Sequence, residues 1–114
     1  MQQLPPEITA QLDMPEGSLK VGYTFPVPLS EAPEERLTLI AGVSPSSALV
    51  RIDLDESLHI HFVRQGGAAA DVGVDLSPLL GAQRFYFWGT WSPLAMQIQV
   101  IDRDSGKMVT SDPE

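Results

Sequence analysis

No cysteine occurs among the 114 residues. This absence excludes disulfide bonds, zinc–thiolate centres and thiol nucleophiles, and it fits a reducing compartment without requiring one. No apolar run approaches the roughly 20 residues that a membrane-spanning helix needs. The first residues, Met1 to Pro6, have neither the basic stretch nor the apolar stretch of a signal peptide. By default we therefore expect a cytoplasmic protein.

Basic residues are scarce, with 7 Lys and Arg against 15 Asp and Glu, for a net charge of −8. Nucleic-acid binding needs a basic surface that displaces counterions from phosphates, and anionic membranes attract proteins through the same kind of surface. We therefore expect neither nucleic acid nor membrane as a partner. The acidity serves solubility, or it attracts cations or basic partners.

The length fits one domain, flanked by two short terminal segments. Residues 1–16 contain Pro5, Pro6 and Pro15 and are predicted to form an arm. Because adjacent prolines lack amide donors and interrupt helices and central strands, the arm is expected to contribute at most an edge strand around Ile8–Leu12. The domain proper is predicted to span residues 17–110, and residues 111–114 to form a frayed tail.

Between these ends the hydrophobic residues recur with a period of two, which is typical of strands with one buried face. Residues 76–80 are predicted to form the one short helical turn. Many short strands separated by glycine and proline predict an all-β, antiparallel sandwich of two sheets. The alternating stretches are residues 19–25, 37–43, 50–55, 58–64, 70–74, 83–91, 96–100 and 107–110.

The order of these segments resembles the laminin-G-like branch of the concanavalin A-like lectin and glucanase fold. The resemblance covers residues 17–110 and implies a jelly roll of two sheets, one of them curved. An immunoglobulin-like sandwich is the structural alternative. The stretches that carry the resemblance are residues 17–21, 37–42, 48–60, 85–92 and 97–109.

The same resemblance bears on catalysis. Retaining glucanases of this fold carry a Glu-x-Asp-x-x-Glu strand, whose two glutamates must lie about 5–5.5 Å apart. This chain reads Arg51-x-Asp53-x-x-Glu56, and an arginine cannot attack a glycosidic bond. A Gly-x-Ser-x-Gly elbow of the α/β-hydrolase type is also missing. We expect no enzyme, and no cofactor.

Residues 48–64 are predicted to form a hairpin with a turn at residues 55–57. In this register Asp53 faces His59 and Arg51 faces His61, all on the polar side of the sheet. The carboxylate should raise the pKa of His59, and the guanidinium should lower that of His61. The patch is either an ordinary solvated sheet face, a polar binding surface or a metal site, although Arg51 opposes a cation.

The strand 84–91 is rich in aromatic residues. Phe85 and Phe87 are predicted to face the core, which leaves Tyr86 and Trp88 on the opposite face. Such rings either bind sugars, anchor a protein interface or are covered within the fold. The 1–16 arm, a second subunit or a ligand would supply the cover, and we expect a homodimer.

The segment Asp102-x-Asp104-x-Gly106 is similar to part of a calcium loop, and calcium binding near such loops is implied by the laminin-G resemblance. The EF-hand pattern needs further carboxylates, where Lys107 follows instead. A β-turn is therefore the preferred interpretation, with Asp102 and Asp104 as weak metal candidates.

Together these features predict a non-catalytic interaction module. Its expected binding surface is the sheet face of Arg51, Asp53, His59 and His61, with Tyr86 and Trp88 as the second choice. A carbohydrate-binding, lectin-like domain and a structural subunit that assembles through its aromatic face are the alternatives.

Overall fold

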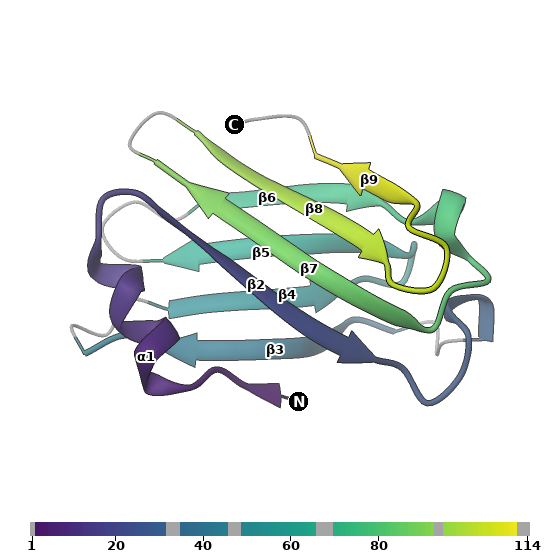
Figure 1. Cartoon of the computed structure of the whole chain (residues 1–114), viewed down its shortest axis with the longest axis horizontal. Helices are drawn as coiled ribbons and strands as arrows, with labels where there is room; N and C mark the ends of the chain where they lie inside the picture. The colour runs from purple at the N-terminus through teal and green to yellow at the C-terminus, as the bar shows by residue number, and fades with distance from the viewer. Residues whose placement is uncertain (1, 32–34, 46–48, 66–69, 93–94, 112–114) are drawn as a thin grey trace.

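The computed structural model describes residues 2–31, 35–45, 49–65, 70–92 and 95–111, which form two stacked β-sheets (Figure 1). The strands are β1 (Gln2–Gln3), β2 (Gly17–Thr24), β3 (Leu37–Val43), β4 (Leu49–Leu54), β5 (His59–Gln65), β6 (Ala70–Asp75), β7 (Arg84–Trp91), β8 (Met96–Asp102) and β9 (Met108–Thr110). The helical pieces are α1 (Pro6–Thr9) and the 3-10 turns η1 (Ala10–Asp13), η2 (Leu29–Glu31) and η3 (Ser77–Leu79). The predicted helical turn near residues 76–80 is confirmed by η3.

One sheet has the strand order β1-β3-β4-β5-β6, and we call it sheet A. The other, sheet B, has the order β2-β7-β8-β9. Every neighbouring pair is antiparallel except β1 with β3. In Figure 1 the strands of sheet B lie in front and run obliquely across those of sheet A. The predicted all-β sandwich is confirmed.

The core between the sheets follows the period-two pattern. Side chains from β4, β5, β7 and β8 meet there, and Phe62, Phe85 and Phe87 are completely buried. Gly89 leaves room for the Phe62 ring of the other sheet, because a Cβ at this position would lie 2.7 Å from two carbons of that ring. Sequence alternation therefore indicates which residues of each layer are buried, and a glycine in one sheet accommodates a phenylalanine ring of the other.

The N-terminal arm differs from the prediction. The expected edge strand around Ile8–Leu12 is wrong, because this stretch forms α1 and η1. Pro6 begins the helix at a position where no amide donor is needed, so the proline pair starts a helix rather than preventing one. The arm packs into the fold: Leu12 is 1% exposed, and Gln2–Gln3 add a parallel strand to β3.

The C-terminal segment is held at its first residue. The amide of Ile98 donates to Ser111 Oγ at 2.9 Å, so Ser111 is held against sheet B. The rest of the predicted tail, residues 112–114, lies outside the described residues.

Within the part of the chain that the structure describes, no helix is long and apolar enough to cross a membrane.

Candidate functional sites

The β4–β5 hairpin carries the first predicted site, and its register differs from the prediction. Asp53 lies opposite His61, not His59, and Arg51 lies opposite Val63. The loop falls one residue later than expected, closed by a hydrogen bond from the Asp55 amide to the His59 carbonyl at 3.0 Å.

The cause is the conformation of Leu58. Its φ of 59° places it in the left-handed region, where glycine or asparagine is expected. The prediction assigned Leu58 to the strand, which placed the centre of the turn one residue too early. The error shifts the pairing partner of each β4 residue by two positions, so every side chain of the hairpin keeps its predicted face of the sheet. The predicted inner face is buried apart from the half-buried Leu58. The buried residues of that face are Val50, Ile52, Leu54, Ile60 and Phe62.

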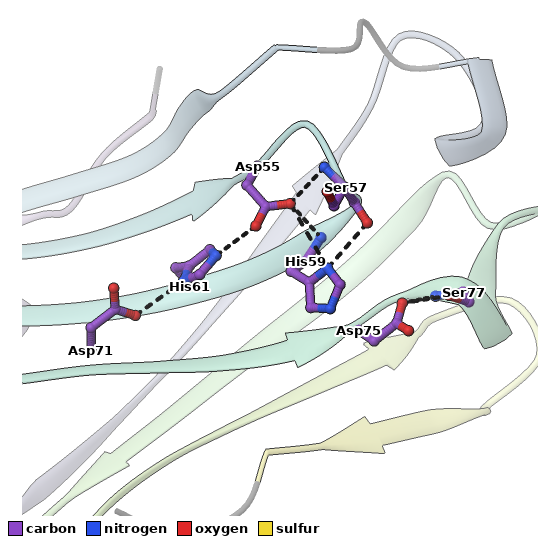
Figure 2. A network of polar contacts seen from close by, with 7 residues as sticks. All are labelled: Asp55, Ser57, His59, His61, Asp71, Asp75 and Ser77. Atoms are coloured by element: carbon purple, nitrogen blue, oxygen red, sulfur yellow. Dashed lines mark hydrogen bonds and ion pairs between the residues drawn. The ribbon is translucent and has the colours of Figure 1, made fainter.

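His61 lies between two carboxylates on the outer face of sheet A (Figure 2). Its Nε2 is 2.8 Å from Asp55 Oδ2, and its Nδ1 is 3.1 Å from Asp71 Oδ1. Only a doubly protonated ring donates at both nitrogens, so this arrangement favours the imidazolium form. The ring passes over Gly73, where a Cβ would lie 3.5 Å from it.

The charges of this group follow from its geometry. Burial disfavours the imidazolium, but the hydrogen bonds to Asp55 and Asp71 outweigh it and raise the pKa of His61. The predicted lowering by Arg51 is therefore wrong, since that guanidinium contacts Asp53 instead. Burial also opposes ionisation of Asp55, yet amide donors of His59 and Ser57 and the His61 ring hold its pKa below the ordinary value.

His59 does not pair with Asp53, which corrects the predicted cross-strand contact. Its Nδ1 lies 3.1 Å from the Ser57 carbonyl oxygen and 3.9 Å from Asp55 Oδ1, as Figure 2 shows. Opposite His59, Asp75 accepts hydrogen bonds from the Ser77 amide and hydroxyl, which lower the pKa of Asp75. His59, the first residue of β5, thus contacts the hairpin turn rather than the opposite strand β4.

Asp53 is 2% exposed, although it lies on the outer face of its strand. Its Oδ2 accepts from Arg51 Nε at 2.9 Å and from Arg36 Nη2 at 3.1 Å, whereas its buried Oδ1 has no hydrogen-bond partner among the described residues. Glu56 is exposed in the turn, as predicted. A carboxylate enclosed by two guanidinium groups is unsuited to nucleophilic or acid–base work.

Three participants on this face were not predicted from the sequence. Asp55 was assigned to the turn alone, Asp71 lies on the short β6, and Arg36 precedes β3 in a loop. Each of the three contacts a site residue that was predicted from the sequence, His61 or Asp53. These contacts depend on strand pairing or on the path of a loop, which no local sequence pattern encodes. The acidic residues spaced by four in Asp71-x-x-x-Asp75 were the available signal, because alternate strand positions share a face.

The Asp102–Gly106 segment is a turn, as preferred. Asp102 accepts from the Ser105 hydroxyl and from the Asp104 amide, and these bonds keep its pKa below the ordinary value despite partial burial. Asp104 lies 3.7 Å from Arg84, and Gly106 has a φ of 78°. In the described part of the chain, no group of three or more His, Cys, Asp or Glu residues could hold a metal ion.

The outer face of sheet B carries the second predicted site. Phe85 and Phe87 point into the core as predicted, Tyr86 is half-buried and Trp88 is 38% exposed. We call this surface the aromatic–basic face. Its strand positions are Ser18, Lys20, Gly22, Thr24, Arg84, Tyr86, Trp88, Thr90, Gln97, Gln99, Ile101, Met108 and Thr110, with Arg103 at the end of β8.

Two cations converge on the rings of this face. Lys20 Nζ lies 4.5 Å from the centre of the Tyr86 ring and 5.2 Å from that of Trp88, and Arg103 Cζ lies 4.6 Å from Tyr86. Neither cation forms an ion pair with any described carboxylate. The arm contacts β3 at the far layer, so it does not supply the cover expected for these rings.

Comparison with known proteins gives no relative on which to draw, since no protein family, curated protein or solved structure matches the chain.

Proposed function

We propose that the protein is a non-catalytic binding module and that the aromatic–basic face is its binding surface. One observation carries the proposal: two cations that have no partner among the described carboxylates lie over the half-buried Tyr86 ring, and one of them also over the exposed Trp88 ring, in a protein of net charge −8. None of the strand positions of this face is Asp or Glu, although the chain has 15 of them. A face that only contacts solvent does not require acidic residues to be kept away from basic ones, whereas a surface that binds an electron-rich or acidic partner does.

The face of Arg51, Asp53, His59 and His61 is the weaker choice. Its charged groups are already matched, since Asp53 joins Arg36 to Arg51 and His61 joins Asp55 to Asp71. A ligand would have to replace these contacts before it gained any of its own. We interpret this network as the polar cover of sheet A.

Carbohydrate binding is the second candidate, and it agrees with the laminin-G-like resemblance. Trp88 is the most exposed ring, and its cross-strand neighbours are Lys20 and Gln99. An aromatic plane beside an amide and an ammonium group suits the apolar face and hydroxyl groups of a sugar ring. Assembly of two copies through the same rings is the third candidate.

Amide chemical-shift mapping tests the proposal. The labelled protein is titrated with a neutral oligosaccharide, a sulfated oligosaccharide and an acidic peptide. We expect at least one probe to shift the amides of β2, β7 and β8 while those of β5 and β6 stay unchanged. Shifts confined to the His61 network, or none with any probe, would contradict the proposal.

A pair of variants provides the control. Trp88→Ala should weaken the binding found in the titration, because it removes the exposed ring. Leu80→Ala removes an equally exposed side chain, 38% accessible, from the connection between β6 and β7, and it should leave binding unchanged. Equal losses in both variants would indicate a general loss of hydrophobic surface rather than a defined site.

A further inference from the structure

We propose that the partner is an acidic, extended polypeptide segment that adds to sheet B along the free edge of β2. This inference rests on the proposed function and names the partner's chemistry. The segment would form backbone hydrogen bonds with β2, and its acidic side chains would lie against Lys20 and Arg103. Three features of the edge carry the inference: its open backbone, its charge and its half-covered inner side.

The backbone of β2 is free on one side. Among the described strands it pairs with β7 alone, in one continuous register without a bulge. The Phe25 amide donates to the Gln83 carbonyl at 2.9 Å, so by antiparallel alternation the odd-numbered residues bond toward β7. The backbone groups of Lys20, Gly22 and Thr24 therefore point away from the sheet, and no described backbone group pairs with them.

The other sheet edges are less suitable for a partner strand. Strand β1 has two residues and β9 has three, whereas β2 has eight. Strand β6 is longer, but it carries Asp71 and Asp75, whose charges would repel an acidic segment. Natural proteins protect long free edges with charge or a cover, and β2 has Lys20 alone. An edge of this length whose backbone is open and whose charge is of one sign is available for the addition of an oppositely charged strand.

The charge beside this edge selects the partner. Arg103 reaches from the end of β8 across Tyr86 to β2, and a Cβ at Gly22 would lie 3.4 Å from its Nη1. The glycine thus leaves room for a guanidinium group next to the open backbone. With Lys20 on the neighbouring outward position, the edge presents two cations, and none of the residues of β2 itself is acidic. Acidic side chains on the added strand complement them.

The inner side of the edge adds a second requirement. Val21 and Tyr23 point toward the core yet remain half-buried, so their outer flanks are open. Side chains alternate across a strand, and every second residue of the added segment would contact these flanks. The fitting sequence therefore alternates acidic with apolar residues. A second copy fits poorly, because antiparallel β2–β2 pairing brings the two Lys20 and Arg103 pairs together.

Binding of the peptide acetyl-Glu-Val-Glu-Val-Glu-Val-Glu-amide, measured by calorimetry with hydrogen exchange, tests the proposal. We expect binding together with slower exchange of the Lys20, Gly22 and Thr24 amides. Two control peptides should fail: one with lysine in place of glutamate, and one N-methylated at every residue, whose backbone cannot donate hydrogen bonds. Equal binding of either control would overturn the acidic or the strand-addition part of the proposal.

Charge reversal on the protein completes the test. Lys20→Glu and Arg103→Glu should each weaken peptide binding about tenfold or more, because each turns an attraction into a repulsion. Lys107→Glu makes the same change in net charge at an exposed turn residue outside the face and should have little effect. All three positions are exposed, and circular dichroism verifies folding. If all three variants weaken peptide binding equally, the weakening is due to the change in net charge, and the proposed contacts with Lys20 and Arg103 are overturned.

The outcomes separate this inference from the proposed function. Sugar binding on the aromatic–basic face without peptide binding refutes the partner and leaves the binding module in place. Failure of every probe refutes both. A dimer in light scattering that Lys20→Glu strengthens identifies a second copy as the occupant of the edge and also refutes the acidic partner.

Discussion

Leu58 adopts a backbone conformation that costs most residues roughly 1–2 kcal/mol, and its position explains why residue-level reasoning partly failed. Turn rules expect glycine or asparagine there, so an apolar residue was assigned to the strand. Its side chain packs against the core, and its carbonyl accepts the Leu76 amide at 3.0 Å. These tertiary contacts offset the local cost, and no sequence pattern records them.

The sidedness of β5 leads to a prediction about stability. Ile60 is completely buried, so Ile60→Ala should destabilise the fold by about 2–5 kcal/mol. His59 is half exposed at the start of β5, and His59→Ala should cost less than about 1 kcal/mol. Urea unfolding of both variants measures the difference. Similar losses would mean that the two faces of β5 are assigned the wrong way round.

The His61 network predicts a pH dependence. A raised histidine pKa stabilises the fold fully below the ordinary value of 6.5, and this stabilisation is lost as the pH rises through the folded-state pKa. The lowered pKa of Asp55 stabilises above 3.8 and loses its effect as the pH falls through the folded-state pKa. The network should therefore stabilise most between about pH 4 and 6.5.

Unfolding of the His61→Asn variant measures this effect. Relative to the unchanged protein, its loss of stability should be larger at about pH 5.5 than at about pH 9, since only the imidazolium is favoured by both carboxylates. His59→Asn, whose ring contacts a backbone carbonyl, is the matched comparison. An equal loss for His61→Asn at both pH values would rule out a charged ring in the folded protein.

At the scale of the elements, the strands could be predicted and their partners only in part. Alternating side chains mark which residues of a strand are buried, and this gave the inward face of β7 and of the β4–β5 hairpin. The conformation of the arm and the contacts of His61 depend on information outside the local sequence pattern. The arm is helical because Pro6 occupies a helix start, and the Asp55–His61–Asp71 contacts depend on pairing between β5 and β6. Pairing is a property of two segments.

The contact between the sheets yields a prediction on glycine. Gly89→Ala would place a methyl group 2.7 Å from the Phe62 ring, so the sheets must separate or the ring must move. We expect a loss of about 1–3 kcal/mol, as for overpacked cores. Gly81→Ala is the control, because nothing lies within 4 Å of its added Cβ.

Thermal unfolding of the two glycine variants distinguishes packing from a general effect of alanine. Phe62→Leu in the Gly89→Ala background should recover part of the loss, since a smaller side chain leaves room for the methyl group. If Gly89→Ala is no less stable than Gly81→Ala, the Phe62 ring does not pack as closely against Gly89 as described.

At the scale of the whole molecule, charge is distributed unevenly between the two layers. The net charge of −8 is visible in the sequence and led us to expect neither nucleic acid nor an anionic membrane as a partner. The fold qualifies this expectation, because strand pairing gathers Lys20, Arg84 and Arg103 on a face whose strand positions include no Asp or Glu, although Asp104 of the adjoining turn lies 3.7 Å from Arg84. Composition describes the sum of charges, whereas a partner meets one side.

The separated charges give binding an unusual dependence on ionic strength. The Cα trace of the molecule extends 24 Å along its thinnest direction. At about 0.01 M salt the screening length is roughly 30 Å, so an approaching acidic chain feels the full negative charge and is repelled. At about 0.1 M it is roughly 10 Å, and only the near, positive layer is felt; at about 1 M both effects vanish. The association rate of an acidic peptide, measured by stopped flow, should therefore pass through a maximum near physiological salt. A steady fall with added salt would mean that the far layer exerts no influence on encounter.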